Sequence, residues 1–320
     1  MSVKKSAIRI VGGLLGGLVL AGAVHAEAPM VKKQAPGYYR TMLGDFEVTA
    51  LSDGTVGLQV DDLLLNTTKD HVREVLDKHF LSVPLPTSVN SYLINTGEKL
   101  VLVDTGAGSL FGPTLGNLVD HLKASGYEPG QVDEIYITHM HPDHVGGLVS
   151  EGKIVFPNAT VRANKQDADY WLNEDNLEAA DEESKGFFKG AMASLNPYVE
   201  AGQFKPFTGN EELASGITAM AAKGHTSGHS VYKVQSQDET MILIGDLIHV
   251  GAVQFPQPDI AIQFDSTPEQ AVKSREEVFD EIQQQEYLLG GAHLSFPGLG
   301  HLLEDQDGYE YIPSNYEGEM

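Results

Sequence analysis

Cysteine is absent from the 320-residue sequence. The chain therefore has no disulfide bonds, no thiolate nucleophile and no thiolate ligand for a metal ion. A chain of this length can bury a substantial hydrophobic core, so the core and any bound metal ions must hold the fold together. Any metal ligands must be nitrogen or oxygen atoms of His, Asp or Glu side chains.

Basic residues are scarce. The chain has 21 Lys and Arg residues against 45 Asp and Glu residues, which gives a formal net charge of -24. Such a surface repels nucleic acids and anionic lipids, so neither is expected as a partner. The expected substrate is a small neutral molecule, although metal ions bound at a site would reverse the electric field locally.

Long apolar segments are missing after the N-terminus. Lys4, Lys5 and Arg9 precede an apolar, glycine-rich run at residues 10–24, and Val24 and Ala26 offer small residues at the cleavage positions. The run is short for a membrane span, and this order of features is typical of a secretory signal peptide. We therefore predict that residues 1–26 are cleaved and that residues 27–320 form a single domain in the periplasm or outside the cell. An uncleaved N-terminal anchor is the alternative.

Strands and helices alternate along the predicted domain. In the first half the expected elements are an opening strand pair at residues 45–60, three further strands at residues 91–95, 100–104 and 132–138, and two helices at residues 69–79 and 114–125. In the second half they are four strands and one helix, at residues 217–222, 231–235, 241–244, 287–289 and 267–284. The strand segments are short and apolar, and the helix segments show apolar residues on one face. This alternation predicts a layered α/β fold.

The segment that follows residues 132–138 carries the strongest chemical pattern. His139 and His141 are two residues apart, so their side chains point to the same side of an extended segment. Pro142 suits the first position of a helix, and Asp143 and His144 would lie on the first turn of that helix. The alternative is that these four residues lie on a solvated turn, where their clustering would gain little. They are well suited to hold metal ions.

Three more loops at strand ends supply candidate ligands. They contain His229, Asp246 and His293, and each follows an apolar strand in the second half of the chain. His225 lies four residues before His229, and we expect it to order that loop rather than to bind a metal ion. A supporting role is also considered for two nearby histidines, His249 and His301.

In this order the pattern resembles the metallo-β-lactamase superfamily, whose members fold as a four-layer αββα sandwich. The resemblance covers nearly the whole chain after residue 103. Stretches outside the ligand set are similar to the group of methyl parathion hydrolase and related periplasmic lactonases and arylesterases, at residues 245–255, 293–301 and 311–316. The resemblance implies a first metal ion held by His139, His141 and His229. It implies a second ion held by Asp143, His144 and His293, with Asp246 as the bridge.

A site of this kind implies hydrolysis. Two divalent ions, either zinc or manganese, cobalt or iron, would share a water molecule that ionises near neutral pH. This bridging hydroxide is the expected nucleophile, with Asp143 and Asp246 as catalytic residues. The resemblance implies neutral esters or lactones as substrates, such as the aryl lactone dihydrocoumarin, and organophosphate triesters as a side activity. A β-lactam or thioester hydrolase and a non-catalytic metal-binding protein are the alternatives. The resemblance also implies a homodimer.

Residues 164–196 differ in character from the rest of the chain, because they are helical, acidic and rich in aromatic residues. Their aromatic rings either pack a helical insert onto the domain or form a lid above the metal loop. The lid interpretation predicts an apolar wall that binds neutral rings. Together with large apolar residues near the other loops, it predicts a substrate pocket lined by Phe111, Trp171, Phe187, Phe188, Leu294 and Phe296.

Overall fold

The computed structural model describes residues 28–182, 184–306 and 308–318. The predicted signal peptide, residues 1–26, lies outside these residues, and its cleavage stays a prediction. Residues 36–320 form one compact unit, whereas residues 28–35 belong to a separate N-terminal unit and contain no helix or strand. Within the described part of the chain, no helix combines the length and the apolar character needed to cross a membrane.

The first sheet has six strands in the spatial order β1-β2-β3-β4-β5-β8. Neighbours from β1 to β4 are antiparallel, and β5 pairs in parallel with both β4 and β8. The strands are β1 (Tyr38–Leu43), β2 (Phe46–Leu58), β3 (Leu85–Asn95), β4 (Leu100–Val103), β5 (Glu134–Tyr136) and β8 (Thr160–Arg162). Four α-helices lie between these strands in the sequence: α1 (Val60–Leu63), α2 (Lys69–Lys78), α3 (Leu118–Ala124) and α4 (Pro142–Val145).

The second sheet has seven strands in the spatial order β15-β14-β13-β12-β11-β10-β9. Only β12 and β13 are parallel, because the long helix α9 (Pro268–Gln284) connects them. The strands are β9 (Glu211–Ala214), β10 (Ile217–Ala221), β11 (Ser230–Ser236), β12 (Glu239–Leu243), β13 (Leu288–Gly290), β14 (Leu299–Asp305) and β15 (Gly308–Pro313). A separate short hairpin is formed by β6 (Val149–Ser150) and β7 (Lys153–Ile154).

The sequence analysis expected no strand after residues 287–289, but the structure has two more. The hairpin of β14 and β15 extends the sheet beyond β13. Leu302 is buried while its neighbour Leu303 is exposed, so β14 covers the core with one face only. Because apolar residues alternate with exposed and acidic ones, β14 lacks the continuous apolar run that marked the other strands.

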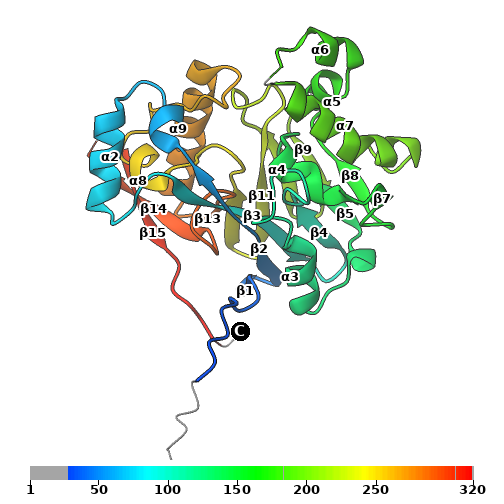
Figure 1. Cartoon of the computed structure of the whole chain (residues 1–320). Coiled ribbons are helices and arrows are strands. Elements are labelled where there is room, and N and C mark those ends of the chain that lie inside the picture. Colours follow the sequence, from blue (N-terminus) through cyan, green and yellow to red (C-terminus); the bar gives the residue numbers. More distant parts are fainter. Residues whose placement is uncertain (1–27, 183, 307, 319–320) are drawn as a thin grey trace, which may run out of the picture. The chain divides into compact units, whose positions relative to one another are not determined.

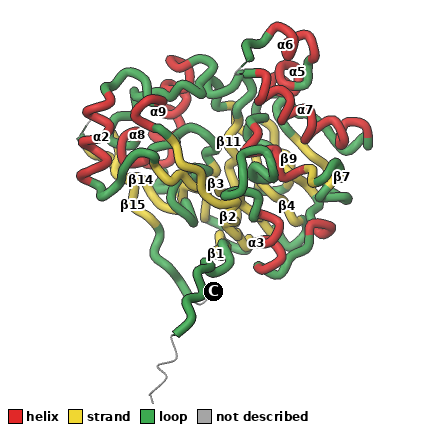
Figure 2. The backbone as a smooth tube through the Cα atoms, viewed as in Figure 1, coloured by secondary structure: helices red, strands yellow, loops and turns green. Residues whose placement is uncertain are grey.

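Side chains from alternate strand positions build the layers. On β3, Leu93 packs with the helices outside the first sheet, whereas Tyr92 and Ile94 point into the core between the two sheets. On the far side of the second sheet, Val278 and Phe279 of α9 pack onto the strands. The order is therefore helices, sheet, sheet, helices, as Figures 1 and 2 show. The predicted four-layer αββα fold is confirmed.

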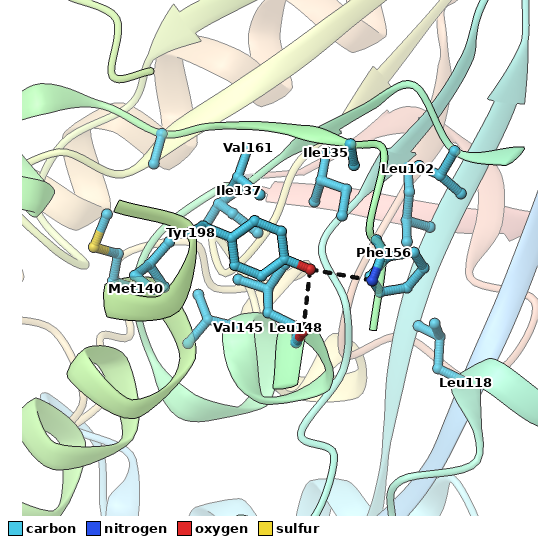
Figure 3. Packing of buried hydrophobic residues seen from close by; sticks show 14 of the residues in the cluster. Leu102, Leu118, Ile135, Ile137, Met140, Val145, Leu148, Phe156, Val161 and Tyr198 are labelled. Carbon is cyan, nitrogen blue, oxygen red and sulfur yellow. Dashed lines mark hydrogen bonds between the residues drawn. The ribbon is translucent and has the colours of Figure 1, made fainter. Parts of the chain in front are cut away.

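The predicted helical insert is present as three helices: α5 (Lys165–Trp171), α6 (Glu174–Ala179) and α7 (Lys185–Glu200). It packs firmly on the first sheet. The hydroxyl group of Tyr198 accepts a hydrogen bond from the backbone N–H of Phe156 at 3.2 Å and donates one to the carbonyl oxygen of Leu148 at 3.1 Å (Figure 3). Phe188 lies in the same hydrophobic cluster and is only 1% exposed. Part of the aromatic content of the insert is therefore core.

Candidate metal centre

The loop after β5 has the predicted local geometry. His139 and His141 follow the strand, and Pro142 is the first residue of the short helix α4 (Pro142–Val145). The backbone behind the loop is tightly packed, because a Cβ atom on Gly146 would lie 2.0 Å from the carbonyl oxygen of Ala107. Only glycine fits there. The glycine at this position therefore lets the histidine loop pack closely against the loop that follows β4.

One half of the site combines three histidines with one oxygen of Asp246. The Nε2 atom of His225 lies 3.2 Å from Nε2 of His139 and 3.1 Å from Nδ1 of His141. The Oδ2 atom of Asp246 lies 3.2 Å from the same nitrogen of His225. The four potential ligand atoms all lie within 4.8 Å of one another, and all four residues are buried. We refer to His139, His141 and His225 as the first triad.

The other half uses the second oxygen of Asp246. Its Oδ1 atom lies 3.0 Å from Nε2 of His144 and 3.1 Å from Nε2 of His293. The Oδ2 atom of Asp143 lies 3.6 Å from each of these two nitrogens. Asp143, His144 and His293 form the second triad, as the resemblance implied. Because each oxygen of Asp246 faces one triad, this carboxylate is placed to bridge two ions.

These atoms fit a pair of divalent metal ions. Ligands bound tetrahedrally at about 2.0–2.2 Å from a zinc ion lie roughly 3.3–3.6 Å apart, close to the spacing within both triads. Two facing atoms, Nε2 of His144 and Oδ1 of Asp246, are buried without a hydrogen-bond partner. Such atoms are costly to leave unpaired, and a cation between them would satisfy both. Donors of the imidazole and carboxylate type suit zinc, manganese, cobalt and iron.

The prediction that His229 is a ligand and His225 its support is reversed in the structure. The Nδ1 atom of His229 donates to the carbonyl oxygen of Ala222 at 2.9 Å, and its Nε2 atom accepts the backbone N–H of Asp246 at 3.0 Å. Both ring nitrogens of His229 are therefore occupied by backbone groups. The free Nε2 atom of His225 takes the expected place in the first triad.

Groups behind the ligands fix their ring orientations. The Nδ1 atom of His144 bonds to Asp104 at 2.9 Å, and that of His225 bonds to Asp265 at 2.9 Å. The Nδ1 atom of His293 bonds to the carbonyl oxygen of Ser88 at 2.9 Å. Such partners set the tautomer and orientation of a metal-binding histidine. The sequence analysis identified none of these three supporting residues, and Asp265 and Ser88 carry no local signal that could have found them.

The electrostatics of the cluster favour bound cations. Burial lowers the pKa of His139 and of His141 well below the usual value, so both imidazoles are neutral and free to bind a metal ion. Burial alone would raise the pKa of Asp246, but the charges of His144 and His293 outweigh it and hold that pKa well below its usual range. Asp246 is thus ionised, and it lies beside the two neutral imidazole donors of His139 and His141.

A cavity of about 100 Å³ opens above the two triads. Its lining combines ligands with apolar side chains: Val56, Leu58, Phe111, Leu115, His141, Asp143, Phe187, Asp246, His249, Phe264 and His293. Two of the six predicted pocket residues, Phe111 and Phe187, belong to this lining. Their rings are 6.5 Å apart in an edge-to-face arrangement. The sequence analysis missed the remaining apolar wall, because Val56, Leu58, Leu115 and Phe264 lie far from the ligand loops in the sequence.

The other four predicted pocket residues lie elsewhere. Trp171 is 6% exposed and packs edge-on against His141 at 5.3 Å, behind the ligand rather than in the cavity. Phe188 is core, and Phe296 packs against the cluster between the sheets. Leu294 lines a neighbouring cleft of about 470 Å³. Adjacent positions on a helix point about 100° apart, which separates Phe187 from Phe188.

The two other histidines differ in position. The Nε2 atom of His249 lies 3.1 Å from Oδ2 of Asp246, and its ring stacks on that of His293 at 4.8 Å. His249 thus lies inside the site. His301 is exposed on β14 and lines a shallow groove that contains none of the ligands. A supporting role for His301 was therefore a wrong expectation.

Fold and site together define a class of protein, a metal-dependent hydrolase with a two-ion site on the strand-end loops of an αββα sandwich. The sequence profile of the metallo-beta-lactamase superfamily matches residues 84–293, which include all seven residues of the two triads and the bridge. The chain belongs to the metallo-β-lactamase superfamily. The finer relationship to the methyl parathion hydrolase group stays a prediction.

Solved structures of related proteins match nearly the whole chain. Hydrolase AbOPH of the beta-lactamase superfamily is 35% identical, with a TM-score of 0.85 over 89% of this chain and 100% of that chain. AidC, a dizinc quorum-quenching lactonase solved with the product N-hexanoyl-L-homoserine, is 28% identical, with a TM-score of 0.81 over 88% of this chain and 99% of that chain.

A curated relative matches a smaller part. An N-acyl homoserine lactonase of a Bacillus species is 27% identical over 172 residues, which are 48% of this chain and 60% of that protein. The chain thus spans only about three fifths of the length of that relative. The activity and substrates of the whole protein are therefore matters of proposal.

Proposed function

We propose that this protein is a lactonase and esterase for neutral substrates that works with two bound divalent metal ions. The observation that carries the proposal is the position of Asp246, whose two oxygens lie 3.2 Å and 3.0 Å from ligand nitrogens of different triads. A purely structural metal site usually fills every coordination position with protein ligands. Here both triads instead border a cavity that a substrate could enter.

The lining of the cavity supports neutral substrates. Six of its side chains are apolar: Val56, Leu58, Phe111, Leu115, Phe187 and Phe264. None of the lining residues is Lys or Arg, so no lysine or arginine side chain there would pair with an anionic group of a substrate. Apolar area removed from water contributes about 25 cal/mol per Å², and aromatic rings add a preferred stacking geometry. Lactones and esters with an aryl or alkyl group match such a wall.

The residues of the chain then have separate tasks. Bound divalent ions would polarise the carbonyl group and lower the pKa of a water molecule. Both Asp143 and Asp246 line the cavity, but Asp143 is the more accessible carboxylate, because its side chain is 20% exposed against 3% for Asp246. We assign Asp143 the proton transfer: it accepts the proton of the attacking water and returns it to the alkoxide oxygen when the ring C–O bond breaks. Asp246 stays ionised and holds the two halves together.

The related proteins support this choice among the reactions of the superfamily. AidC and the Bacillus protein are both named as lactonases, and AidC as dizinc. We therefore propose zinc as the metal and N-acyl homoserine lactones or aryl lactones as substrates. Phosphotriester hydrolysis would use the same site, since a site that stabilises a tetrahedral oxyanion also suits a phosphoryl transition state.

The test is a substrate panel with the zinc-loaded protein. It compares kcat/KM for N-hexanoyl homoserine lactone, dihydrocoumarin, phenyl acetate, paraoxon, the β-lactam nitrocefin and a neutral thioester. We expect the lactones to exceed nitrocefin by roughly 100-fold or more, as expected for a site shaped for one substrate class. A preference for the β-lactam or the thioester would contradict the proposal. Two bound ions without turnover of any ester would favour the non-catalytic alternative.

We further propose that the protein is exported and cut after Ala26. The support is the order of basic, apolar and small residues at the N-terminus. Intact mass measurement of the protein from a periplasmic fraction tests this. A chain that begins at residue 27 agrees with the proposal, whereas a full-length chain in the membrane fraction would favour the anchor.

A further inference from the structure

A buried carboxylate in the helical insert has no part in the site described so far. Asp167 lies on α5 and is 0% exposed. It accepts three hydrogen bonds, from the backbone N–H of Met140 at 3.1 Å, the hydroxyl group of Thr226 at 2.8 Å and the backbone N–H of Gly228 at 2.6 Å. Among the described residues it forms no ion pair. Burying a carboxylate in this way is costly unless its hydrogen bonds serve a purpose.

All three donors lie next to ligands of the first triad. Met140 stands between His139 and His141, and Thr226 directly follows His225. Gly228 belongs to the same loop as His225, and the loop approaches α5 so closely that a Cβ atom on Gly228 would lie 2.6 Å from the backbone nitrogen of Asp167. One carboxylate thus ties together the two loops that supply the first triad.

The same helix makes a second contact with the first triad. Trp171 lies one turn after Asp167 on α5, and its ring packs edge-on against that of His141 at 5.3 Å. The carboxylate therefore holds the backbone of the histidine loop, while the indole ring limits the rotation of one of its ligands.

The second triad is held by other elements. Its His144 bonds to Asp104 at the end of β4, and its His293 bonds to the carbonyl oxygen of Ser88 on β3. Asp167 has no hydrogen bond to Asp143, His144 or His293 among the described residues. The two triads therefore have different hydrogen-bonded supports, and among those named here only the carboxylate behind the first triad comes from the insert.

We propose that Asp167 is a positioning residue for the first triad, so that the insert sets the affinity for one of the two metal ions. An Asn side chain has the same shape but only one acceptor oxygen, and it cannot accept all three hydrogen bonds. Loss of partners behind metal ligands typically lowers metal affinity by about 10–100-fold. We expect a loss of this size for one ion in Asp167→Asn and little change for the other.

The experiment counts metal ions rather than turnover. Wild type, Asp167→Asn and the control Asp169→Asn are loaded with Co²⁺, dialysed against rising concentrations of a chelator and analysed for cobalt per chain and by visible absorption. Asp169 lies on the exposed side of the same helix and pairs with Lys165, so its variant controls for the loss of a charge on α5. If Asp167→Asn does not fold, Thr226→Val takes its place. This variant removes a single hydrogen-bond donor to Asp167, and we expect it to lower the affinity for one cobalt ion several-fold.

The expected result is stepwise release. Asp167→Asn should lose its first cobalt ion at a chelator concentration about 10–100-fold lower than wild type, with a changed absorption spectrum, and should keep the second ion. Asp169→Asn should match wild type. Equal weakening of both ions, or release curves that match wild type in both Asp167→Asn and Thr226→Val, would overturn the inference. The inference rests on the two-ion site of the proposed function, and a wild type that binds no pair of ions would refute that site instead.

Discussion

The backbone N–H of Asp246 donates a hydrogen bond of 3.0 Å to Nε2 of His229. The nitrogen that would bind a metal ion is therefore used to hold the residue that bridges the two triads. A Cβ atom at the preceding residue, Gly245, would lie 2.7 Å from the same nitrogen, so the chain turns tightly over the imidazole ring. His229 thus supports the site by holding the backbone of Asp246, and His225 completes the first triad.

Asp246→Asn should weaken both halves of the site at once. Its two oxygens face different triads, and an amide offers one acceptor oxygen and no negative charge. We expect the loss in kcat/KM for lactones to exceed the roughly 10–100-fold that loss of a supporting partner costs. Steady-state kinetics with metal analysis measures this, and an unchanged circular dichroism spectrum is the control. A variant with two bound ions and activity within tenfold of wild type would contradict the bridging role.

Phe187→Ala and Phe188→Ala form a matched pair, because one ring lines the cavity and its neighbour lies in the core. Phe187→Ala should lower kcat/KM for dihydrocoumarin by an amount that corresponds to about 1–3 kcal/mol of lost transition-state stabilisation. The value for γ-butyrolactone should change little, because this lactone is too small to contact Phe187. Phe188→Ala should instead lower the free energy of unfolding by about 3–5 kcal/mol and leave the ratio of the two substrates unchanged. The same ratio in both variants would show that Phe187 does not contact the substrate.

The pH dependence of stability should report on His229. Burial lowers the pKa of its imidazole from 6.5 to about 3 in the folded protein. Between these values the unfolded chain binds more protons than the native one, so the contribution of His229 is complete above pH 6.5 and is lost as the pH falls. At pH 5 the loss is about 2 kcal/mol.

The measurement compares urea unfolding of wild type and His229→Gln at pH 7.5 and pH 5. Glutamine can donate to Ala222 and accept from Asp246 but does not titrate in this range. The stability advantage of wild type over the variant should therefore shrink by about 2 kcal/mol on acidification. An advantage that is constant with pH would mean that His229 is not buried in the neutral form.

The parts of the site that depend on short-range pattern could be predicted from the sequence. These local features are the apolar strand, the alternate histidines and Pro142 at the helix start. They were enough to predict the four ligands of the loop after β5. The choice between His225 and His229 is not local, because it depends on which ring the backbone of Asp246 meets after the second sheet has formed. Asp167 was equally hidden, since one buried acid in an acidic insert looks like its exposed neighbours in the sequence.

Metal content tests the two-ion site most directly. Purified wild type, His225→Gln and His229→Gln are loaded with zinc, freed of excess metal and analysed for zinc per chain. We predict about two ions for wild type, about one for His225→Gln and about two for His229→Gln, because only His225 belongs to a triad. A single ion in fully active wild type, or loss of an ion in His229→Gln with both ions retained in His225→Gln, would contradict this account.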